Sequence, residues 1–166
     1  MSFAVGGECL RMIHAEEGCV LHAYRDKAHI WTIGWGTTHY PDGKAVQEGD
    51  TCTQAEADAY FMAHLAPMAL QVYQLTQRND LTQAQVDALC CLVYNIGIEG
   101  YRKSRLRQLI VANPNDPGIL PEWVKWHYSE QNGPPPPEPD AVLWRRRWRE
   151  VHHYLAVDQI PTPPMP

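Results

Sequence analysis

Two acidic residues and one threonine lie close together in a glycine-rich stretch near the start of the chain. Glu17 and Asp26 are nine positions apart, and Thr32 follows six positions later, within the segment EGCVLHAYRDKAHIWTIGWG. Two carboxylates that meet on a glycine-lined surface suit hydrolysis of a glycosidic bond, because one protonates the leaving oxygen while the other directs a water or attacks. The pattern therefore predicts a catalytic pair, with the hydroxyl of Thr32 beside it.

The segment before Gly18 has the pattern of a short helix over residues 4–17. Apolar side chains recur there at helical spacing, at Val5, Cys9 and Ile13. Gly18 is a typical helix stop, so we expect Glu17 in the last turn. The negative end of the helix dipole disfavours an ionised carboxylate at that place. The position thus favours the protonated form that a general acid requires.

The segment after Asp26 has the pattern of a strand, from Ile30 to Gly36. Side-chain alternation places bulky residues on one face and leaves the other nearly bare, with Thr32 standing on it. The bulky residues are Trp31, Ile33 and Trp35, and the bare face holds Gly34 and Gly36. Glycine in a strand often marks the close approach of a ligand, so Gly34 is a candidate substrate-binding residue. Asp26 then falls in the loop before the strand.

About ten positions of this stretch follow a known pattern, which runs Glu-Gly, Leu, Tyr-x-Asp and Thr-Ile-Gly-aromatic-Gly. They are Glu17-Gly18, Leu21, Tyr24-Arg25-Asp26 and Thr32-Ile33-Gly34-Trp35-Gly36. Here the chain resembles glycoside hydrolase family 24, the phage-type lysozymes. The resemblance implies that Glu17, rather than its neighbour Glu16, is the general acid, and that Asp26 and Thr32 hold the attacking water. The alternative is a surface helix, a turn and a buried strand whose acidic residues are merely solvated.

The sequence departs from the family pattern at two places. The family usually has glycine in the turn before the strand, where this chain has Ala28-His29-Ile30. It usually has histidine after the second glycine of the strand, where this chain has Thr37. We expect the first departure to alter the backbone of the turn and the second to remove an ion-pairing group. Neither changes the three candidate catalytic residues.

Two capping signatures predict the long helices that follow. Thr53-Gln54-Ala55-Glu56 is a capping box that opens a helix running to about Gln77. Pro67 falls inside it, so we expect either a kink or two helices. Thr82-Gln83-Ala84-Gln85 opens a second, core helix, which is expected to end at Asn95-Ile96-Gly97.

Three residues of the second half are further candidates for substrate binding. Asn95 resembles a family amide that faces the cleft, where it would bond Glu17 or the sugar; the alternative is a local helix cap. A last helix is expected over residues 141–156, and its Leu, paired Arg and Glu resemble the family's C-terminal motif. By that resemblance, Arg145 or Arg146 pairs with Glu17 or contacts the wall. The alternative is a solvated basic helix face.

The resemblance implies an α+β, lysozyme-like fold that is mainly helical, with a small antiparallel sheet lobe, an all-helical lobe and a cleft between them. One domain over residues 1–156 is expected. Its parts are an N-lobe over 14–52, a linking helix over 53–77 and a helical C-lobe over 78–156 on which the helix of residues 1–13 packs. The Pro-Asp-Gly turn at 41–43 predicts a hairpin in the N-lobe, and residues 157–166 form a proline-rich tail.

Charge and hydropathy argue against several classes of protein. The 166 residues include 14 basic and 19 acidic side chains, a net charge of −5, and one arginine cluster on an acidic chain is no nucleic-acid footprint. No apolar run of membrane-spanning length occurs, and the N-terminus lacks the pattern of a Sec signal peptide. We expect a protein made in the bacterial host cytoplasm that acts on the periplasmic wall after release, through a holin if it comes from a phage.

Eight histidines and five cysteines show no metal-binding spacing, so neither a metal nor another cofactor is expected. The odd number of cysteines favours reduced thiols over a disulfide framework. The resemblance implies a monomer whose partner is the glycan of bacterial peptidoglycan.

Three functions fit these patterns to different degrees. The first is a muramidase that cuts the β-1,4 bond between N-acetylmuramic acid and N-acetylglucosamine with inversion, and so lyses cells. The second is a catalytically inactive, lysozyme-fold module that binds peptidoglycan. The third is a protein-interaction module that uses the proline-rich loop at 134–139 and the basic helix. Only the first uses the spacing of Glu17, Asp26 and Thr32.

Overall fold

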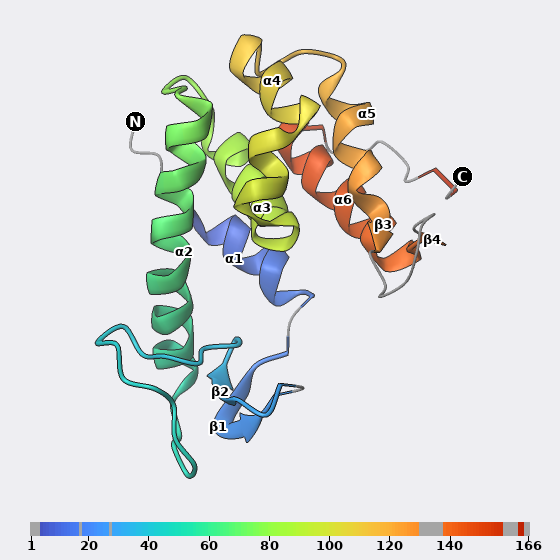
Figure 1. Cartoon of the computed structure of the whole chain (residues 1–166). Coiled ribbons are helices and arrows are strands. Elements are labelled where there is room, and N and C mark those ends of the chain that lie inside the picture. The colour runs from blue at the N-terminus through green and yellow to red at the C-terminus, as the bar shows by residue number, and fades with distance from the viewer. Residues whose placement is uncertain (1–3, 17, 27, 130–137, 158–162, 165–166) are drawn as a thin grey trace.

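The chain folds as a small sheet and a group of helices at the two ends of one long helix (Figure 1). The structure is a computed structural model, and it describes residues 4–16, 18–26, 28–129, 138–157 and 163–164. The long helix is α2, Gln54–Thr76. The mainly helical α+β class with a small antiparallel sheet, expected from the sequence, is confirmed.

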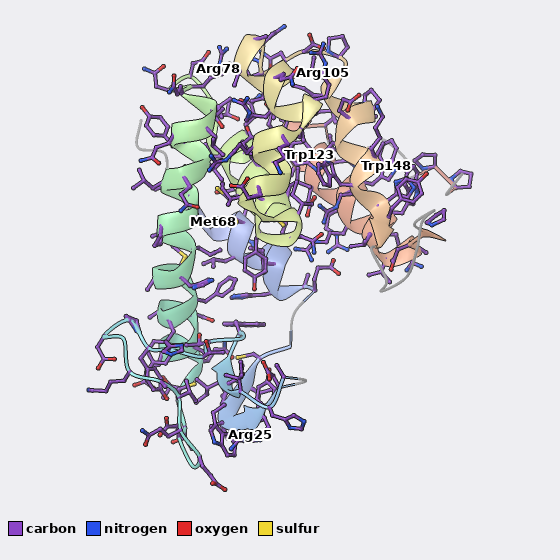
Figure 2. All side chains as sticks on the ribbon, in the orientation of Figure 1. Arg25, Met68, Arg78, Arg105, Trp123 and Trp148 are labelled. Carbon is purple, nitrogen blue, oxygen red and sulfur yellow. The ribbon has the colours of Figure 1, made fainter. Side chains whose placement is uncertain are left out.

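The helical part is built around α3, Gln83–Lys103, on which α1, α2 and α6 pack. Residues 85–93 of α3 are all buried, as expected for a helix that is covered on every side. Trp123 lies in the interior of the same part (Figure 2) and is fully buried. The other helices are α1 Gly7–His14, α4 Arg105–Ala112, α5 Ile119–Val124, the 3-10 helix η1 Lys125–His127 and α6 Ala141–Leu155.

Both predicted capping boxes are present, at Thr53 before α2 and at Thr82 before α3. One helix spans both sides of Pro67, so the expected alternative of two helices is wrong, whereas the alternative of a kink stays a prediction. Ala63 and Pro67 both lie on the exposed side of α2. The carbonyl that loses its partner to the proline therefore faces water, which can satisfy it.

The regular part of α3 ends where the sequence predicts. Gly97 has φ 77° and ψ 156°, outside the helical region, and the chain resumes a helical course to Lys103. Such a positive φ favours glycine. The side chain of Ser104 then accepts a hydrogen bond from the backbone of Arg107 and caps α4.

The first helix is shorter than expected, because α1 covers Gly7–His14 rather than residues 4–17. Its start is tied to α3, since the amide of Gly6 donates to Oδ1 of Asp87 at 2.6 Å. Cys9, Met12 and Ile13 are buried against the helical core. The end of α1 is thereby fixed to the helical part of the molecule.

The sheet pairs β1, Val20–Arg25, with β2, Trp31–Gly34, in antiparallel orientation. A strand before Asp26 was not expected, whereas the strand after it was. The predicted hairpin around Pro41-Asp42-Gly43 is confirmed by a bridge between His39 and Ala45. A second small sheet pairs β3, Tyr128–Ser129, with β4, Glu138–Pro139.

Two of the predicted segments fall mainly outside the described residues. Prolines 134–137 of the proline-rich loop belong there, as do residues 158–162 and 165–166 of the tail. Within the described part of the tail, the carbonyl of Pro163 accepts a hydrogen bond from the indole of Trp144.

Candidate active site

Two adjacent glutamates, Glu16 and Glu17, follow the end of α1 in the sequence. Glu17 lies outside the described residues. The amides of Ala15 and Glu16 extend the last turn by bonding the carbonyls of Arg11 and Ile13. The carboxylate of Glu16 pairs with the guanidinium of Arg149 at 2.7 Å. Glu16 is therefore engaged in an ion pair, and the role of Glu17 as the general acid stays a prediction.

Asp26 sits at the turn of the β1–β2 hairpin. Its Oδ1 accepts hydrogen bonds from the amides of Ala28, at 2.8 Å, and Ile30, at 2.9 Å. The backbone of Asp26 also donates to the carbonyl of Ile30. Both side-chain bonds go to Oδ1, so among the described residues the turn holds the carboxylate without using Oδ2.

Strand alternation puts Thr32 on the same face of this hairpin as Asp26, which directly follows β1. It pairs with Tyr24, two residues before Asp26, which makes Asp26 and Thr32 diagonal neighbours across the strands. Such neighbours stand about 7–8 Å apart. Contrary to the expected bare face, Thr32 is only 3 % exposed. Its hydroxyl donates to the carbonyl of Ile30 at 3.1 Å, so its lone pairs remain as acceptors.

Gly34 is buried against α2. Its φ is 63°, and a Cβ atom there would lie 3.0 Å from the Cβ of Ala57. The positive φ and the close approach of Ala57 are enough to explain glycine at this position, without a contact to a ligand. Its role in substrate binding stays a prediction.

The turn has a strained residue where the family usually has glycine. His29 adopts φ 60°, the left-handed region that L-residues avoid. Replacing it by glycine (His29→Gly) removes a cost of about 1–2 kcal/mol but adds about 0.5–1 kcal/mol of unfolded-chain entropy. We therefore expect an unchanged or slightly higher free energy of unfolding, measured by urea denaturation. His39→Gly, in extended backbone, is the control and should destabilise; equal effects of the two would contradict this account.

A pocket of about 220 Å³ lies beside the hairpin, between the segment after β2 and the helices α2 and α3. It combines aromatic rings with hydroxyl and imidazole groups, a lining that suits a sugar. Its lining residues are Trp35, Gly36, Thr37, Thr38, His39, Tyr60, Phe61, His64 and Tyr94. The helical residues among them were not predicted, because helical periodicity marks them only as core or surface.

A stacked pair joins the end of α1 to this pocket. The rings of His14 and Trp35 lie 3.5 Å apart and nearly parallel, and the indole of Trp35 donates to Oδ1 of Asp58 at 2.7 Å. Burial lowers the pKa of His14, and the bond from Trp35 lowers the pKa of Asp58. The pair therefore links α1, the segment after β2 and α2 at the pocket wall.

A buried charge cluster lies where α6 meets α3 and α5. Oε1 of Glu150 is 3.2 Å from Nε of Arg146 and 3.2 Å from Nη2 of Arg147. Glu150 also accepts hydrogen bonds from Cys91, on α3, and from Trp123, on α5. Burial and the charge of Glu150 raise the pKa of the Cys91 thiol, which keeps it protonated as a donor.

The predicted substrate-binding residues of the second half are placed differently. Arg145 is exposed, whereas Arg146 is 6 % exposed and belongs to the buried charge cluster. Asn95 is exposed, and its Oδ1 accepts a hydrogen bond from Nη2 of Arg147 at 2.8 Å. Arg147 was expected only as one of the paired arginines of the family's C-terminal motif, with Leu143, Arg146 and Glu150, and not as a residue of the site. Substrate contacts of Asn95, Arg145 and Arg146 stay predictions.

The residues that the structure describes contain neither a metal-binding cluster nor a membrane-spanning helix. Within these ranges, no three His, Cys, Asp or Glu side chains gather as metal ligands would. No helix in the described ranges is both long and apolar enough to cross a membrane.

Comparisons with known proteins extend the resemblance beyond the hairpin. A family model for phage lysozyme matches residues 14–150. The endolysin of Acyrthosiphon pisum secondary endosymbiont phage 1 is 35% identical over 139 residues, which are 82% of this chain and 89% of that protein. The endolysin of Salmonella phage P22 is 35% identical over 133 residues, 80% of this chain and 85% of that protein. A crystal structure of a P22 lysozyme mutant superimposes with a TM-score of 0.78 at 28% identity, covering 93% of this chain and 99% of the other.

Proposed function

Because the chain belongs to the phage lysozyme family, and is therefore a muramidase that hydrolyses peptidoglycan, we propose that it does so with inversion and with Glu17 as the acid. The bond cut is the β-1,4 link between N-acetylmuramic acid and N-acetylglucosamine. Asp26 and Thr32 direct the water. The observation that carries these roles is the hairpin that sets Asp26 and Thr32 on one face, diagonal to each other.

The hydrogen bonds of the hairpin allow the side chains of Asp26 and Thr32 to act as two acceptors for one water. The hydroxyl of Thr32 spends its proton on the carbonyl of Ile30 and so offers a lone pair. Asp26 uses Oδ1 for the turn, and in the part of the chain that the structure describes Oδ2 accepts no hydrogen bond and can take one from the water. A water that donates one proton to each presents its own lone pair to the anomeric carbon.

The reaction then follows the inverting scheme. The water oxygen bonds to the anomeric carbon while its proton passes to Asp26, and the glycosidic bond breaks as Glu17 protonates the leaving oxygen. Attack from the face opposite the leaving group inverts the configuration at that carbon. The scheme requires a carboxyl separation of about 6.5–9.5 Å, against about 5–5.5 Å for a retaining enzyme.

The test is digestion of purified peptidoglycan, followed by mass spectrometry and by proton NMR of the first product. We expect new reducing ends on N-acetylmuramic acid, with the α-anomer formed first. Initial release of the β-anomer would overturn inversion. A folded protein that binds peptidoglycan but releases no reducing ends would favour the catalytically inactive binding module.

The remaining features of the proposal concern the whole protein. We propose a single domain over residues 1–156 that works as a monomer on glycan strands, with no role for nucleic acid, consistent with the net charge of −5. It is made in the host cytoplasm and reaches the periplasmic wall after release. We therefore expect that expression of the protein lyses the host only when a holin is co-expressed.

A further inference from the structure

One face of α6 carries aromatic rings at helical spacing. Trp144, Trp148 and His152 follow one another at intervals of four residues, with ring centroids 5.7 Å and 5.3 Å apart in edge-to-face contact. The ring of His127, from η1, extends this line at 4.9 Å from Trp144. Trp148 lies on the side of the helical part that is turned away from α2 (Figure 2). We call these four residues the aromatic row.

The two indole N–H groups of the aromatic row differ in their hydrogen bonds. Nε1 of Trp144 donates to the carbonyl of Pro163 at 2.9 Å. Trp148 is only 6 % exposed, and its buried Nε1 has no hydrogen-bond partner in the part of the chain that the structure describes. An indole N–H can only donate, and a buried donor without an acceptor costs stability. Trp148 therefore has an unused donor one helical turn from the indole that already binds a carbonyl of the tail.

The tail is long enough to return along α6 to this face. The helix ends at Leu155, eight residues before Pro163, and Trp144 lies eleven residues back from that end. Eleven helical residues span about 16 Å, whereas eight extended residues reach up to about 26 Å. Since Pro163 is bonded at Trp144, the tail as a whole runs back in the direction opposite to α6.

The composition of the tail suits such a surface. Residues 158–166 read DQIPTPPMP, with four prolines in nine residues. A polyproline II segment makes no internal hydrogen bonds, so its carbonyls are free to accept, and its rings pack in aromatic-lined grooves. Residues two apart in such a segment lie about 6 Å apart, which equals the rise of about 6 Å between Trp144 and Trp148 in the helix. A carbonyl two residues from Pro163 would therefore come level with the unused donor of Trp148.

We propose that the aromatic row is a docking site for an extended proline-rich segment, and that its occupant is the C-terminal segment of the same chain, whose carbonyls bond the indoles of Trp144 and Trp148. The site is separate from the pocket beside the hairpin, so the inference does not depend on the proposed muramidase function. Recognition uses only proline rings and backbone carbonyls. A free peptide of the same sequence therefore binds the aromatic row when the chain's own segment is weakened.

The test follows the indole N–H groups by NMR in the full-length protein labelled with ¹⁵N-tryptophan. Trp144→Phe and Trp148→Phe each keep an aromatic ring and remove the donor, and the signal that disappears assigns each indole. The double variant Pro163→Gly with Pro164→Gly keeps the carbonyls and loses the stiffness of proline. Trp31→Phe, in β2 and outside the aromatic row, is the control.

We expect solvent exchange of the Trp144 and Trp148 indoles to become about four- to thirtyfold faster in the double glycine variant, because each glycine weakens docking through chain entropy. Adding the synthetic peptide DQIPTPPMP to that variant should shift both signals and restore slow exchange. The peptide DQIATAAMA, which lacks the prolines, should do neither, and the Trp31 signal should stay unchanged throughout. Equal exchange at Trp148 in the parent and the double variant would overturn the inference.

Two further measurements identify the occupant and the donor. Slow exchange in the parent should not depend on protein concentration, because the occupant belongs to the same chain; its loss on dilution would assign the occupant to a second copy and contradict the proposal. Adding Trp148→Phe to the double glycine variant should weaken binding of DQIPTPPMP by about two- to tenfold, as for one lost hydrogen bond. The same affinity with and without this indole, in chains that remain folded by circular dichroism, would refute its role. Trp31→Phe should leave that affinity unchanged.

Discussion

Replacing Glu17 by glutamine (Glu17→Gln) is expected to slow glycan cleavage by about 10²–10⁴-fold, the usual contribution of a positioned general acid. Glutamine has nearly the same shape but cannot transfer a proton to the leaving oxygen. Binding should survive, because the pocket and the hairpin are untouched. The measurement is the turbidity loss of outer-membrane-permeabilised Gram-negative cells, with binding to insoluble peptidoglycan measured in parallel.

The control is the same substitution one position earlier, Glu16→Gln. It removes the partner of Arg149, whose side chain is 48 % exposed. An ion pair of that kind contributes about 0–1 kcal/mol. Glu16→Gln should therefore clear cells within about threefold of the parent. If Glu17→Gln still clears cells, or if only Glu16→Gln fails to clear them, the assignment of Glu17 as the general acid is wrong. If the parent itself binds peptidoglycan and clears nothing, the chain is a binding module.

The features that the sequence predicted well have local causes. The two capping boxes need only residues three positions apart, and the end of the regular part of α3 needs only Gly97. The strand after Asp26 follows from alternation in a few residues. The arrangement of Asp26 and Thr32 also has a local cause, because both residues lie on one short hairpin.

The features that were missed depend on distant packing. Thr32 was placed on a bare face, yet it is buried, because alternation does not say what covers each face of a sheet. Pro67 does not divide α2 into two helices, one of the two expected outcomes, and that side of α2 faces water. The arginines after Trp144 looked alike, and only packing separates exposed Arg145 from buried Arg146 and Arg147. The partners of Glu150 are up to 59 positions away in the chain, beyond any local pattern.

That buried charge cluster carries the second large expected effect. Replacing Glu150 by glutamine (Glu150→Gln) leaves the guanidinium groups of Arg146 and Arg147 buried without their carboxylate. Breaking a buried ion pair by removing one partner costs about 3–5 kcal/mol, because an uncompensated charge stays inside. We therefore expect the free energy of unfolding to fall by about that amount, measured by urea denaturation monitored by circular dichroism.

Two comparisons separate buried charge from the mere loss of contacts on α6. Arg149→Gln removes a charge one position away, in an exposed pair, and should cost less than about 1 kcal/mol. Replacing the whole cluster with apolar side chains, Arg146→Met, Arg147→Met and Glu150→Leu together, removes every buried charge at once. Such replacements are often neutral or stabilising. The triple variant should therefore be more stable than Glu150→Gln, although it lacks more hydrogen bonds. If it is less stable, the cluster stabilises the fold through its hydrogen bonds to Cys91 and Trp123 rather than through charge compensation.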